Sequence, residues 1–335
     1  FKAHSKGIEM KKIISVILIG TVVWVVFNSN TKIKTPPAPD NLKGSITITG
    51  AFALYPLAVK WAEEFRKIHP GVRIDVSAGG AGKGITDVLS KVSDIGLLSR
   101  DLNPEEEKRG AFPLTVTKDA VVPTVSAKNP ILFDLLVKGI KKEALNNLFI
   151  VGDYKYWEQA TGIKTKMSVH VYTRSDAAGA AETWAKYFGK KQEDLLGIGV
   201  YGDPGQAQAI KRDPAAIGFS NIVYVYDLKT KEQTNGLIVL PIDLNNNGKI
   251  DVNENFYRRM DDLIAAIAAG KYPAPPARDL FFVTKGKPTN QLVTEFIKYV
   301  LTDGQQYVHE SGYIKLTEEK LRSELSKISN EVVKK

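Results

Sequence analysis

The sequence predicts an α/β fold, because strand patterns alternate with helix patterns along most of the chain. The segments Ser45–Thr49, Val72–Val76 and Val169–Thr173 each alternate apolar and polar residues, as half-buried strands do. Each is followed by a loop of small residues and then by apolar residues at helical spacing. In open α/β sheets the ligand binds outside the carboxyl ends of the strands, so these three loops are the first candidates for a site.

The first unit turns at Gly50–Tyr55 into a helix with Pro56 at its first position, where proline is well tolerated. Leu57, Trp61 and Phe65 then lie four residues apart, which places them on one helix face. We therefore expect this helix to pack against the sheet through that face.

The second unit turns through Ser77–Gly84, which reads SAGGAGKG and is the clearest local signal in the chain. Glycines allow a tight turn and leave backbone N–H groups uncovered, and the following helix adds the positive end of its dipole. We expect an anion site here; the alternative is a tight turn that binds nothing. A nucleotide P-loop is excluded, because Gly84 follows Lys83 where that motif requires Ser or Thr.

Two arginines stand at the ends of predicted strands. Arg100 follows Ser99 after the short strand Asp94–Leu98, and its guanidinium either faces a ligand or pairs with Asp101 or Glu105. Arg174 ends the third unit's strand, before a loop of small residues. It is predicted to be an anion clamp, half of an ion pair with Asp176, or both.

The later part of the chain continues the alternation. Further strands are predicted at Val121–Val125, Ile217–Phe219, Leu237–Leu240 and Leu280–Val283, and a mixed helical stretch at Leu135–Ile150. Helices are predicted around Trp184 and Phe188, from Met260, and from Thr289, with a peripheral helix in the charged tail after Leu316.

One loop matches the calcium-binding pattern D-x-[DN]-x-[DN]-G-x5-E throughout residues 243–254. Gly248 stands at the sharp turn, and the position-seven carbonyl belongs to Lys249. The predicted ligands are Asp243, Asn245, Asn247, Lys249, Asp251 and Glu254. The alternative is an asparagine-rich turn that binds nothing. No apolar helix precedes the loop, so a stabilising Ca²⁺ is expected rather than a switch.

Composition excludes several classes of protein. The chain has 335 residues and no cysteine, so disulfides, thiolate metal sites and cysteine nucleophiles are ruled out. Of the net charge of +9, residues 1–34 carry +5, and no basic run is interleaved with aromatic residues. Nucleic acid is therefore not an expected partner. The four histidines are scattered and no catalytic motif appears, so we do not expect an enzyme.

The N-terminal segment is predicted to be a signal peptide or a membrane anchor. Lys11 and Lys12 precede the apolar run Ile13–Phe27, which is short for a spanning helix. A buried core helix is the alternative. It is disfavoured because a proline-containing linker follows, so residues 1–30 are assigned to the signal or anchor and residues 31–43 to the linker.

Taken in order, six segments resemble the phosphate-type substrate-binding proteins of ABC transporters, a type II periplasmic-binding-protein-like family. They are Gly50–Pro56, Gly79–Gly84, Asp94–Gly96 with Ser99 and Arg100, Arg174–Asp176 with Gly179, Pro275–Arg278, and Leu301–Gln305. The resemblance implies two α/β lobes, joined by a two-strand hinge, that close on a tetrahedral oxyanion. Lobe 1 would comprise residues 44–126 and 279–335, and lobe 2 residues 127–278. The candidate crossover strands are Val121–Ser126 and Leu280–Val283.

The resemblance also implies a ligand set. By position, it comprises Ala53, Leu54, Ala81, Gly82, Ser99, Arg100, Arg174, Ala178, Gly179 and Ala180. The family's usual Ser and Thr hydroxyls are missing at Leu54, Ala81, Ala178 and Ala180, and Ser99 replaces the acidic residue that accepts phosphate's own proton. A lost hydrogen bond to a charged ligand is worth about 1.5–3 kcal/mol, so these departures leave the anion open.

We therefore expect an extracytoplasmic receptor that captures a tetrahedral oxyanion, namely phosphate, and serves an ABC permease as a monomer. The alternatives are sulfate, molybdate, tungstate or a larger anion. A rival from another class is a calcium-stabilised extracellular sensor or interaction module that has lost the anion. A phosphatase would need a nucleophile or metal cluster, which the sequence does not indicate.

Overall fold

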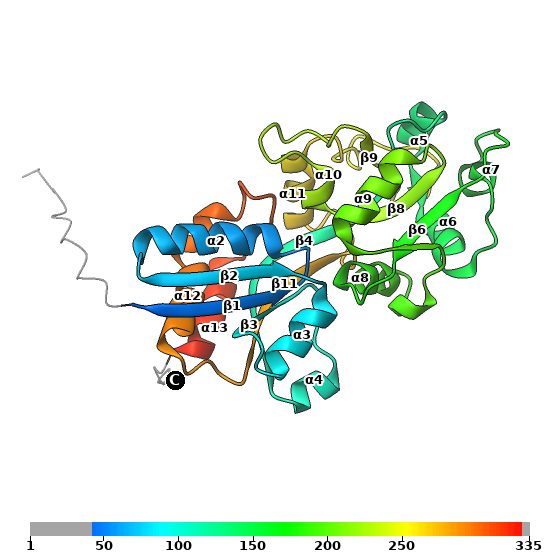
Figure 1. Ribbon diagram of the computed structural model, residues 1–335. Coiled ribbons are helices and arrows are strands. Elements are labelled where there is room, and N and C mark those ends of the chain that lie inside the picture. The colour runs from blue at the N-terminus through cyan, green and yellow to red at the C-terminus, as the bar shows by residue number, and fades with distance from the viewer. Residues whose placement is uncertain (1–41, 330–335) are drawn as a thin grey trace, which may run out of the picture. The chain divides into compact units, whose positions relative to one another are not determined.

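The computed structural model describes residues 42–329, which belong to one compact unit (Figure 1). The predicted signal or anchor at residues 1–30, and all but the end of the linker, lie outside the described residues. Within residues 42–329 no helix is both long and apolar enough to cross a membrane.

A nine-stranded mixed sheet runs through this unit. Its strand order is β2-β1-β3-β11-β4-β8-β6-β7, and β9 pairs with β4 off this path. The strands are β1 (Gly44–Gly50), β2 (Val72–Ala78), β3 (Ile95–Leu98), β4 (Ala111–Ser126), β6 (His170–Arg174), β7 (Ile198–Val200), β8 (Ala216–Asn221), β9 (Leu237–Val239) and β11 (Ala277–Lys285). The short strands β5 (Ile140–Lys141) and β10 (Ile242–Asp243) pair separately.

Lobe 1 is defined here as the elements that pack around a hydrophobic cluster containing Trp61, Phe65 and Phe296. Its strands β1, β2 and β3 are parallel, as the strand–loop–helix pattern predicts. Its helices are α2 (Tyr55–Ile68), α3 (Ala81–Leu89), α4 (Pro104–Lys108), α12 (Gln291–Leu301), a 3₁₀ helix at Asp303–Tyr307, and α13 (Glu318–Ile328). Trp61 donates its indole N–H to the Gly304 carbonyl, so the polar group of this buried tryptophan has a hydrogen-bond partner.

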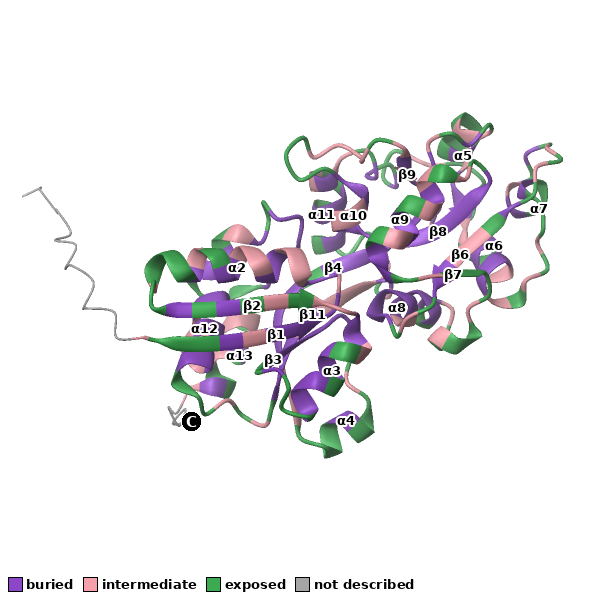
Figure 2. Cartoon of the chain, viewed as in Figure 1, coloured by how far each residue is buried: buried purple, intermediate pink, exposed green. Residues whose placement is uncertain are grey.

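Lobe 2 packs around a second cluster, in which Trp184 contacts Phe149 and Phe219. Its helices are α5 (Leu132–Lys138), α6 (Lys142–Asn146), a π-helical turn at Asn147–Val151, α7 (Trp157–Thr161), α8 (Gly179–Tyr187), a 3₁₀ helix at Gln192–Asp194, α9 (Gly202–Arg212), α10 (Ile222–Val225) and α11 (Met260–Ala268). Figure 2 shows that the central strands and the inner helix faces are buried in both lobes.

Two strands, β4 and β11, connect the lobes. They pair with each other antiparallel, and each contributes residues to both hydrophobic clusters. Leu114 of β4 packs in lobe 1, whereas Val121 packs in lobe 2. Leu280 of β11 packs in lobe 1, and Ala277 contacts the cluster of lobe 2. The predicted two-lobed α/β fold with a two-strand hinge is confirmed, while the exact lobe boundaries stay a prediction.

Most predicted elements are present, with three differences. The strand predicted at Val121–Val125 is the second half of the longer β4. The mixed stretch Leu135–Ile150 divides into α5, β5 and α6, because Gly139 adopts a left-handed φ of 66° after α5. The helix predicted from Thr289 is capped by Asn290, whose side chain accepts the N–H groups of Leu292 and Val293.

The charged tail after Leu316 forms the predicted helix. It forms α13, in which Glu324 and Ile328 are buried against lobe 1. Lys320 and Lys327 pair with the Glu324 carboxylate from either side, which compensates its burial. The helix therefore exposes one face and packs through the other.

Candidate functional site

A small chamber lies where the ends of several strands meet between the lobes. It encloses about 10 Å³, which is room for about one water molecule. Its lining residues come from both lobes and are Ala51, Phe52, Ala53, Gly80, Ala81, Ser99, Arg174, Ala178, Gly179, Ala180 and Asp203. Of the ten predicted ligand residues, seven line this chamber: Ala53, Ala81, Ser99, Arg174, Ala178, Gly179 and Ala180.

The other three predicted residues lie outside the chamber lining. Leu54 is buried in the core of lobe 1, and its N–H bonds to the Ala51 carbonyl. The Gly82 N–H donates to the Ala177 carbonyl of the other lobe at 3.2 Å, so it already serves a contact between the lobes. Lys83, beside it, is held by Asp87 on the same helix.

Glycine is required where the two lobes approach each other. A Cβ atom on Gly179 would lie 2.2 Å from Ser99 Oγ, and Ser99 belongs to lobe 1. Within lobe 1, Gly50 has a φ of 141°, and a Cβ there would lie 2.3 Å from the Leu97 carbonyl oxygen. Gly179 thus allows the two lobes to approach each other beside the chamber, and Gly50 allows two strands of lobe 1 to do so.

Two helices begin at the chamber without side-chain caps. The residues preceding α3 and α8 are Gly80 and Ala178, and neither caps its helix through a side chain. Gly80, Ala178 and the first two residues of α8, Gly179 and Ala180, line the chamber. Uncapped N–H groups and the positive end of the helix dipole favour an anion at this position.

Among residues 42–329, Arg174 is the only arginine or lysine that lines the chamber, and its side chain is almost fully buried. Its Nε donates to Asp176 Oδ1 at 2.9 Å and one terminal nitrogen donates to Asp176 Oδ2 at 2.6 Å. The other terminal nitrogen donates to Asp203 Oδ2 at 2.5 Å. A guanidinium has five N–H groups, so two remain for a further acceptor. The two hydrogen bonds to Asp176 form the ion pair that the sequence predicted.

Burial disfavours the charged form of each side chain in this cluster, but the net effect on the pKa differs between Arg174 and Asp203. Burial works against the charged form of Arg174, yet the carboxylates of Asp203 and Asp176 outweigh it and raise its pKa. Burial also raises the pKa of Asp203, and Arg174 offsets this only in part because it is shared with Asp176. With both carboxylates ionised, the three side chains carry one net negative charge.

A buried network connects this cluster to the hinge. The Asp203 carboxylate accepts a hydrogen bond from Asn221, whose side-chain oxygen accepts one from Arg278 of β11. Arg278 also forms a two-point ion pair with Asp119 of β4, at 2.8 and 3.1 Å. The chamber arginine and the two hinge strands are therefore linked through side chains that are all buried or nearly so.

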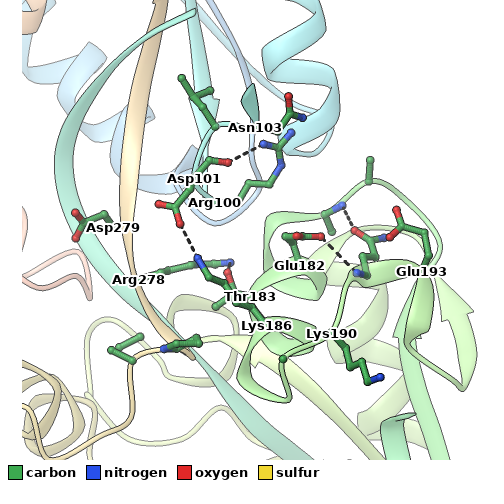
Figure 3. A pocket seen from close by; sticks show the side chains of 18 of the residues that line it. Arg100, Asp101, Asn103, Glu182, Thr183, Lys186, Lys190, Glu193, Arg278 and Asp279 are labelled. Atoms are coloured by element: carbon green, nitrogen blue, oxygen red, sulfur yellow. Dashed lines mark hydrogen bonds and ion pairs between the residues drawn. The ribbon is translucent and has the colours of Figure 1, made fainter. Parts of the chain in front are cut away.

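Arg100 faces a different hollow. Its guanidinium forms a fork with Glu106, at 2.9 and 2.7 Å, rather than with the predicted Asp101 or Glu105 side chains. It lines a pocket of about 920 Å³ between the lobes, shown in Figure 3. Glu182, Lys186 and Arg278 line the same pocket, and Lys186 pairs with Asp101 across the lobes at 2.8 Å.

The calcium-type loop closes on itself through hydrogen bonds. Asp243 accepts the N–H groups of Asn247 and Gly248, at 3.1 and 2.8 Å. Glu254 accepts the N–H groups of Leu244 and Asn245, both at 3.0 Å. The loop thereby gathers the predicted metal ligands, while no group of three or more acidic or histidine side chains that could hold a metal occurs in the described residues.

Four chamber residues lie outside the predicted ligand set: Ala51, Phe52, Gly80 and Asp203. Asp203 follows the short strand β7, in the turn Gly202–Gly205 that opens α9, so it repeats the strand–loop–helix signal of the other units. Phe52 lies near the Arg174 guanidinium, 5.7 Å from ring centre to carbon, and meets the Tyr201 ring edge-to-face. The sequence therefore contains a pattern that could have identified Asp203, but none that could have identified Phe52.

Comparison with known proteins adds to this geometry. A family described as the PBP superfamily domain matches residues 35–304. The phosphate-binding protein PstS of Bacillus subtilis is 30% identical over 285 residues, which cover 84% of this chain and 84% of that protein. The phosphate-binding protein PstS of Methanocaldococcus jannaschii is 24% identical and covers 94% of this chain and 95% of its own length.

Solved structures share the fold. The ABC-type phosphate transport receptor from Vibrio cholerae superposes with a TM-score of 0.59 at 19% identity, over 81% of this chain and all of that chain. A high-affinity periplasmic phosphate-binding protein bound with phosphate gives 0.64 at 12% identity, over 84% and 92%. At these identities the likeness concerns the two-lobed architecture.

Proposed function

Since the chain belongs to the PBP superfamily and, within it, to the phosphate-binding proteins named PstS, we propose that it captures phosphate between its lobes for an ABC importer. One observation carries this proposal. Arg174 lines the chamber, is buried and held rigid by two carboxylates, and keeps two N–H groups for an acceptor. Such an arrangement presents charge-assisted donors to an oxyanion.

Backbone groups supply most of the remaining donors in this proposal. Alanine stands at positions 53, 81, 178 and 180 of the chamber, so no hydroxyl is available there. The Ser99 hydroxyl, the Ala81 N–H of α3 and the first N–H groups of α8 take their place. Because residues of both lobes enclose the chamber, the lobes would open about β4 and β11 to admit the anion and then close on it.

Asp203 favours phosphate over a fully ionised anion. Its carboxylate oxygens each accept one bond from protein groups and retain lone pairs for another donor. Phosphate near neutral pH carries a proton that such a carboxylate accepts, whereas sulfate carries none and is repelled. In lobe 1, Ser99 stands where the family has an acidic residue. Asp203 of lobe 2 would take over the role of that residue.

Isothermal titration of ligand-stripped protein with phosphate, sulfate, molybdate and tungstate tests the proposal. We expect one-to-one binding of phosphate. Arg174→Ala should weaken it about 100-fold or more, since two charge-assisted hydrogen bonds of about 1.5 kcal/mol each are lost. Arg100→Ala is the matched control, because that guanidinium is held by Glu106 outside the chamber.

Arg174→Ala leaves two buried carboxylates unpaired, so Arg174→Lys and a thermal melt accompany it. The lysine variant keeps the charge and loses the fork, and it should bind more weakly while melting cooperatively. Equal phosphate affinity in wild type and both variants would contradict the proposal. No heat with any of the four anions would favour the sensor or interaction module instead.

The remaining parts of the proposal concern context. We propose an extracytoplasmic, monomeric receptor, secreted or anchored through its N-terminal segment, that hands phosphate to a membrane permease. Its role is binding rather than catalysis, and the absence of turnover with phosphomonoesters is the corresponding test. The curated relatives named as phosphate-binding proteins support this assignment.

We also propose that the loop at residues 243–254 binds a stabilising Ca²⁺. The ordered oxygen donors at loop positions 1, 3, 5, 9 and 12 support it. At a hundredfold excess over its dissociation constant, Ca²⁺ should stabilise the protein by about 2.7 kcal/mol, read as a higher melting temperature than in chelator. Glu254→Gln should abolish that difference. The same difference in both proteins, or none in wild type, would refute a site in this loop.

A further inference from the structure

Asn221 is the side chain that connects the hinge to the chamber. It is the last residue of β8, where it pairs with Val121 of β4, and it is 1% exposed. It also precedes α10, a position at which asparagine usually caps a helix through its side chain, but it does not cap α10. The amide instead forms hydrogen bonds with two charged side chains, Asp203 and Arg278.

The partners of this amide fix its orientation. A guanidinium has only donors, so Arg278 must face the side-chain oxygen of Asn221. The NH₂ group then points to the other side and donates to Asp203 Oδ1. Arg278 is itself held by Asp119 of β4, at 2.8 and 3.1 Å, and by Thr183 at 3.1 Å. The ion pair at the hinge thereby determines which end of Asn221 meets the chamber carboxylate.

Asp203 receives one donor on each carboxylate oxygen. Asn221 donates to Oδ1, and Arg174 donates to Oδ2 at 2.5 Å. These donors favour the carboxylate over the acid, whereas burial raises the pKa of Asp203 and favours the acid. The other charged or titratable groups that act on Asp203, or on which it acts, are Asp176, Arg278, Tyr224 and Tyr313. Because Asp176 and Arg278 shift this pKa in opposite directions, the opposition to burial rests on Asn221 and Arg174.

We propose that Asn221 is a positioning residue of the anion site, which holds the Asp203 side chain as an ionised acceptor. Its consequence for selectivity rests on the proposed function: an ionised Asp203 accepts the proton of phosphate and repels sulfate. Asn221 does not line the chamber, so it acts through Asp203 rather than on the anion. Arg278 and Asp119 act on the site through the same amide.

An NMR titration of the ligand-free, full-length protein tests the core of this inference. The protein is labelled with ¹³C at the aspartate carboxyl groups, and the Asp203 signal is the one missing from Asp203→Asn. Asn221→Leu removes the donor at nearly constant volume. The midpoint of the Asp203 signal should then rise by about one pH unit or more, because a hydrogen bond to a charged group is lost. Gln206→Met is the matched control, since it removes another buried amide, which donates to the Phe219 carbonyl at 2.8 Å.

A thermal melt shows whether each variant folds, and Asn221→Asp covers the case in which leucine disrupts the packing. The aspartate keeps an acceptor for Arg278 and turns an acceptor toward Asp203, so the two carboxylates must share a proton. It should therefore raise the Asp203 midpoint as well. Unchanged midpoints in both Asn221 variants, or the same rise in Gln206→Met, overturn the proposal.

Titration calorimetry with phosphate and sulfate tests the consequence for selectivity. The ratio of the two affinities should fall about tenfold for each pH unit by which the midpoint rises, since sulfate would bind the protonated form of Asp203 and phosphate the ionised form. Adding Asn221→Leu to Asp203→Asn should cause no further fall. An equal fall in both backgrounds would mean a purely structural role and overturn the proposal. No phosphate binding by wild type would contradict the proposed function alone, because the NMR titration uses no anion.

Discussion

At the scale of single residues, Arg174 and its two carboxylates decide which anions the chamber accepts. The guanidinium is held by Asp176 and Asp203, so the three ionised side chains carry one net negative charge. A fully ionised dianion meets this charge unfavourably, whereas an anion with a proton can place its O–H toward Asp203. The specificity of the site therefore depends on a residue outside the predicted ligand set.

We expect Asp203→Asn to reduce the preference for phosphate over sulfate. The change removes a charged acceptor, and a hydrogen bond to a charged group is worth about 1.5–3 kcal/mol, so the ratio of the two affinities should fall about tenfold or more. Titration calorimetry with both anions measures it. Asp213→Asn, a change at an ion pair with His170 remote from the chamber lining, is the control. An unchanged ratio in Asp203→Asn would exclude the proposed role of Asp203.

The same variant should change how stability depends on pH. Burial raises the pKa of Asp203 above its unfolded value, so the folded state holds the proton more tightly. The resulting stabilisation is fully present below the unfolded pKa and is lost as pH rises through the folded pKa. The melting temperature of wild type should therefore fall more steeply over that range than that of Asp203→Asn.

The sequence was sufficient to predict those chamber residues that directly follow a strand pattern. Ser99 and Arg174 each directly follow a predicted strand, so strand patterns alone singled them out, whereas Gly179 entered the predicted ligand set through the family resemblance. Arg100 follows the same logic but turns to Glu106, because the Asn103 capping box fixes that carboxylate within its reach. Asp203, 29 residues beyond Arg174, meets it only through the packing of α9 on the sheet.

At the scale of elements, the ion pair between β4 and β11 holds the hinge. Arg278→Ala would leave Asp119 buried and unpaired, and removing one partner of a buried pair costs about 3–5 kcal/mol. We expect a loss of that size in the free energy of unfolding, measured with denaturant. Arg259→Ala breaks a half-exposed pair with Glu232 and should cost less than about 1 kcal/mol.

If Arg278→Ala and Arg259→Ala were equally stable, the hinge pair would have no special role. Arg278 also bonds to Thr183 and Asn221 in lobe 2, so its loss should affect phosphate binding as well as stability. The double variant Arg278→Leu with Asp119→Leu leaves no buried charge at the hinge and should recover part of the stability. That recovery would separate the cost of a lone carboxylate from the cost of lost packing.

Elements with strong periodicity were predicted correctly, and those that depend on tertiary contacts were not. The four-residue spacing of Leu57, Trp61 and Phe65 marked α2 because that face is buried. The first half of β4 contains Pro113 and charged Lys118 and Asp119, which obscured its strand pattern. Pairing with β11 along residues 111–120 makes this half a strand nevertheless, whereas β8 pairs with the second half of β4.

At the scale of the whole described unit, direct contacts hold the lobes together around the chamber. The Gly82 N–H bonds to the Ala177 carbonyl, and the Tyr224 hydroxyl bonds to the Phe52 carbonyl at 2.9 Å. The exposed pair of Lys186 and Asp101 adds little. These contacts are few, so closure depends on the lobes matching in shape at the chamber, and an anion bridging them would shift the population toward the closed state.

The close approach of the lobes at Gly179 and Ser99 gives the last prediction. A methyl group at Gly179 would lie 2.2 Å from Ser99 Oγ and 2.6 Å from the Ser99 carbonyl oxygen, so Gly179→Ala should hold the lobes apart without disturbing either core. If the closed state fell to about one per cent of the population, apparent phosphate affinity would fall about 100-fold. Small-angle scattering should show wild type contracting on phosphate addition and the variant failing to contract. Gly205→Ala, whose added methyl meets only the Val200 side chain of the same lobe, is the matched control and should contract like wild type. Contraction and full affinity in Gly179→Ala would mean that phosphate is bound without this closure.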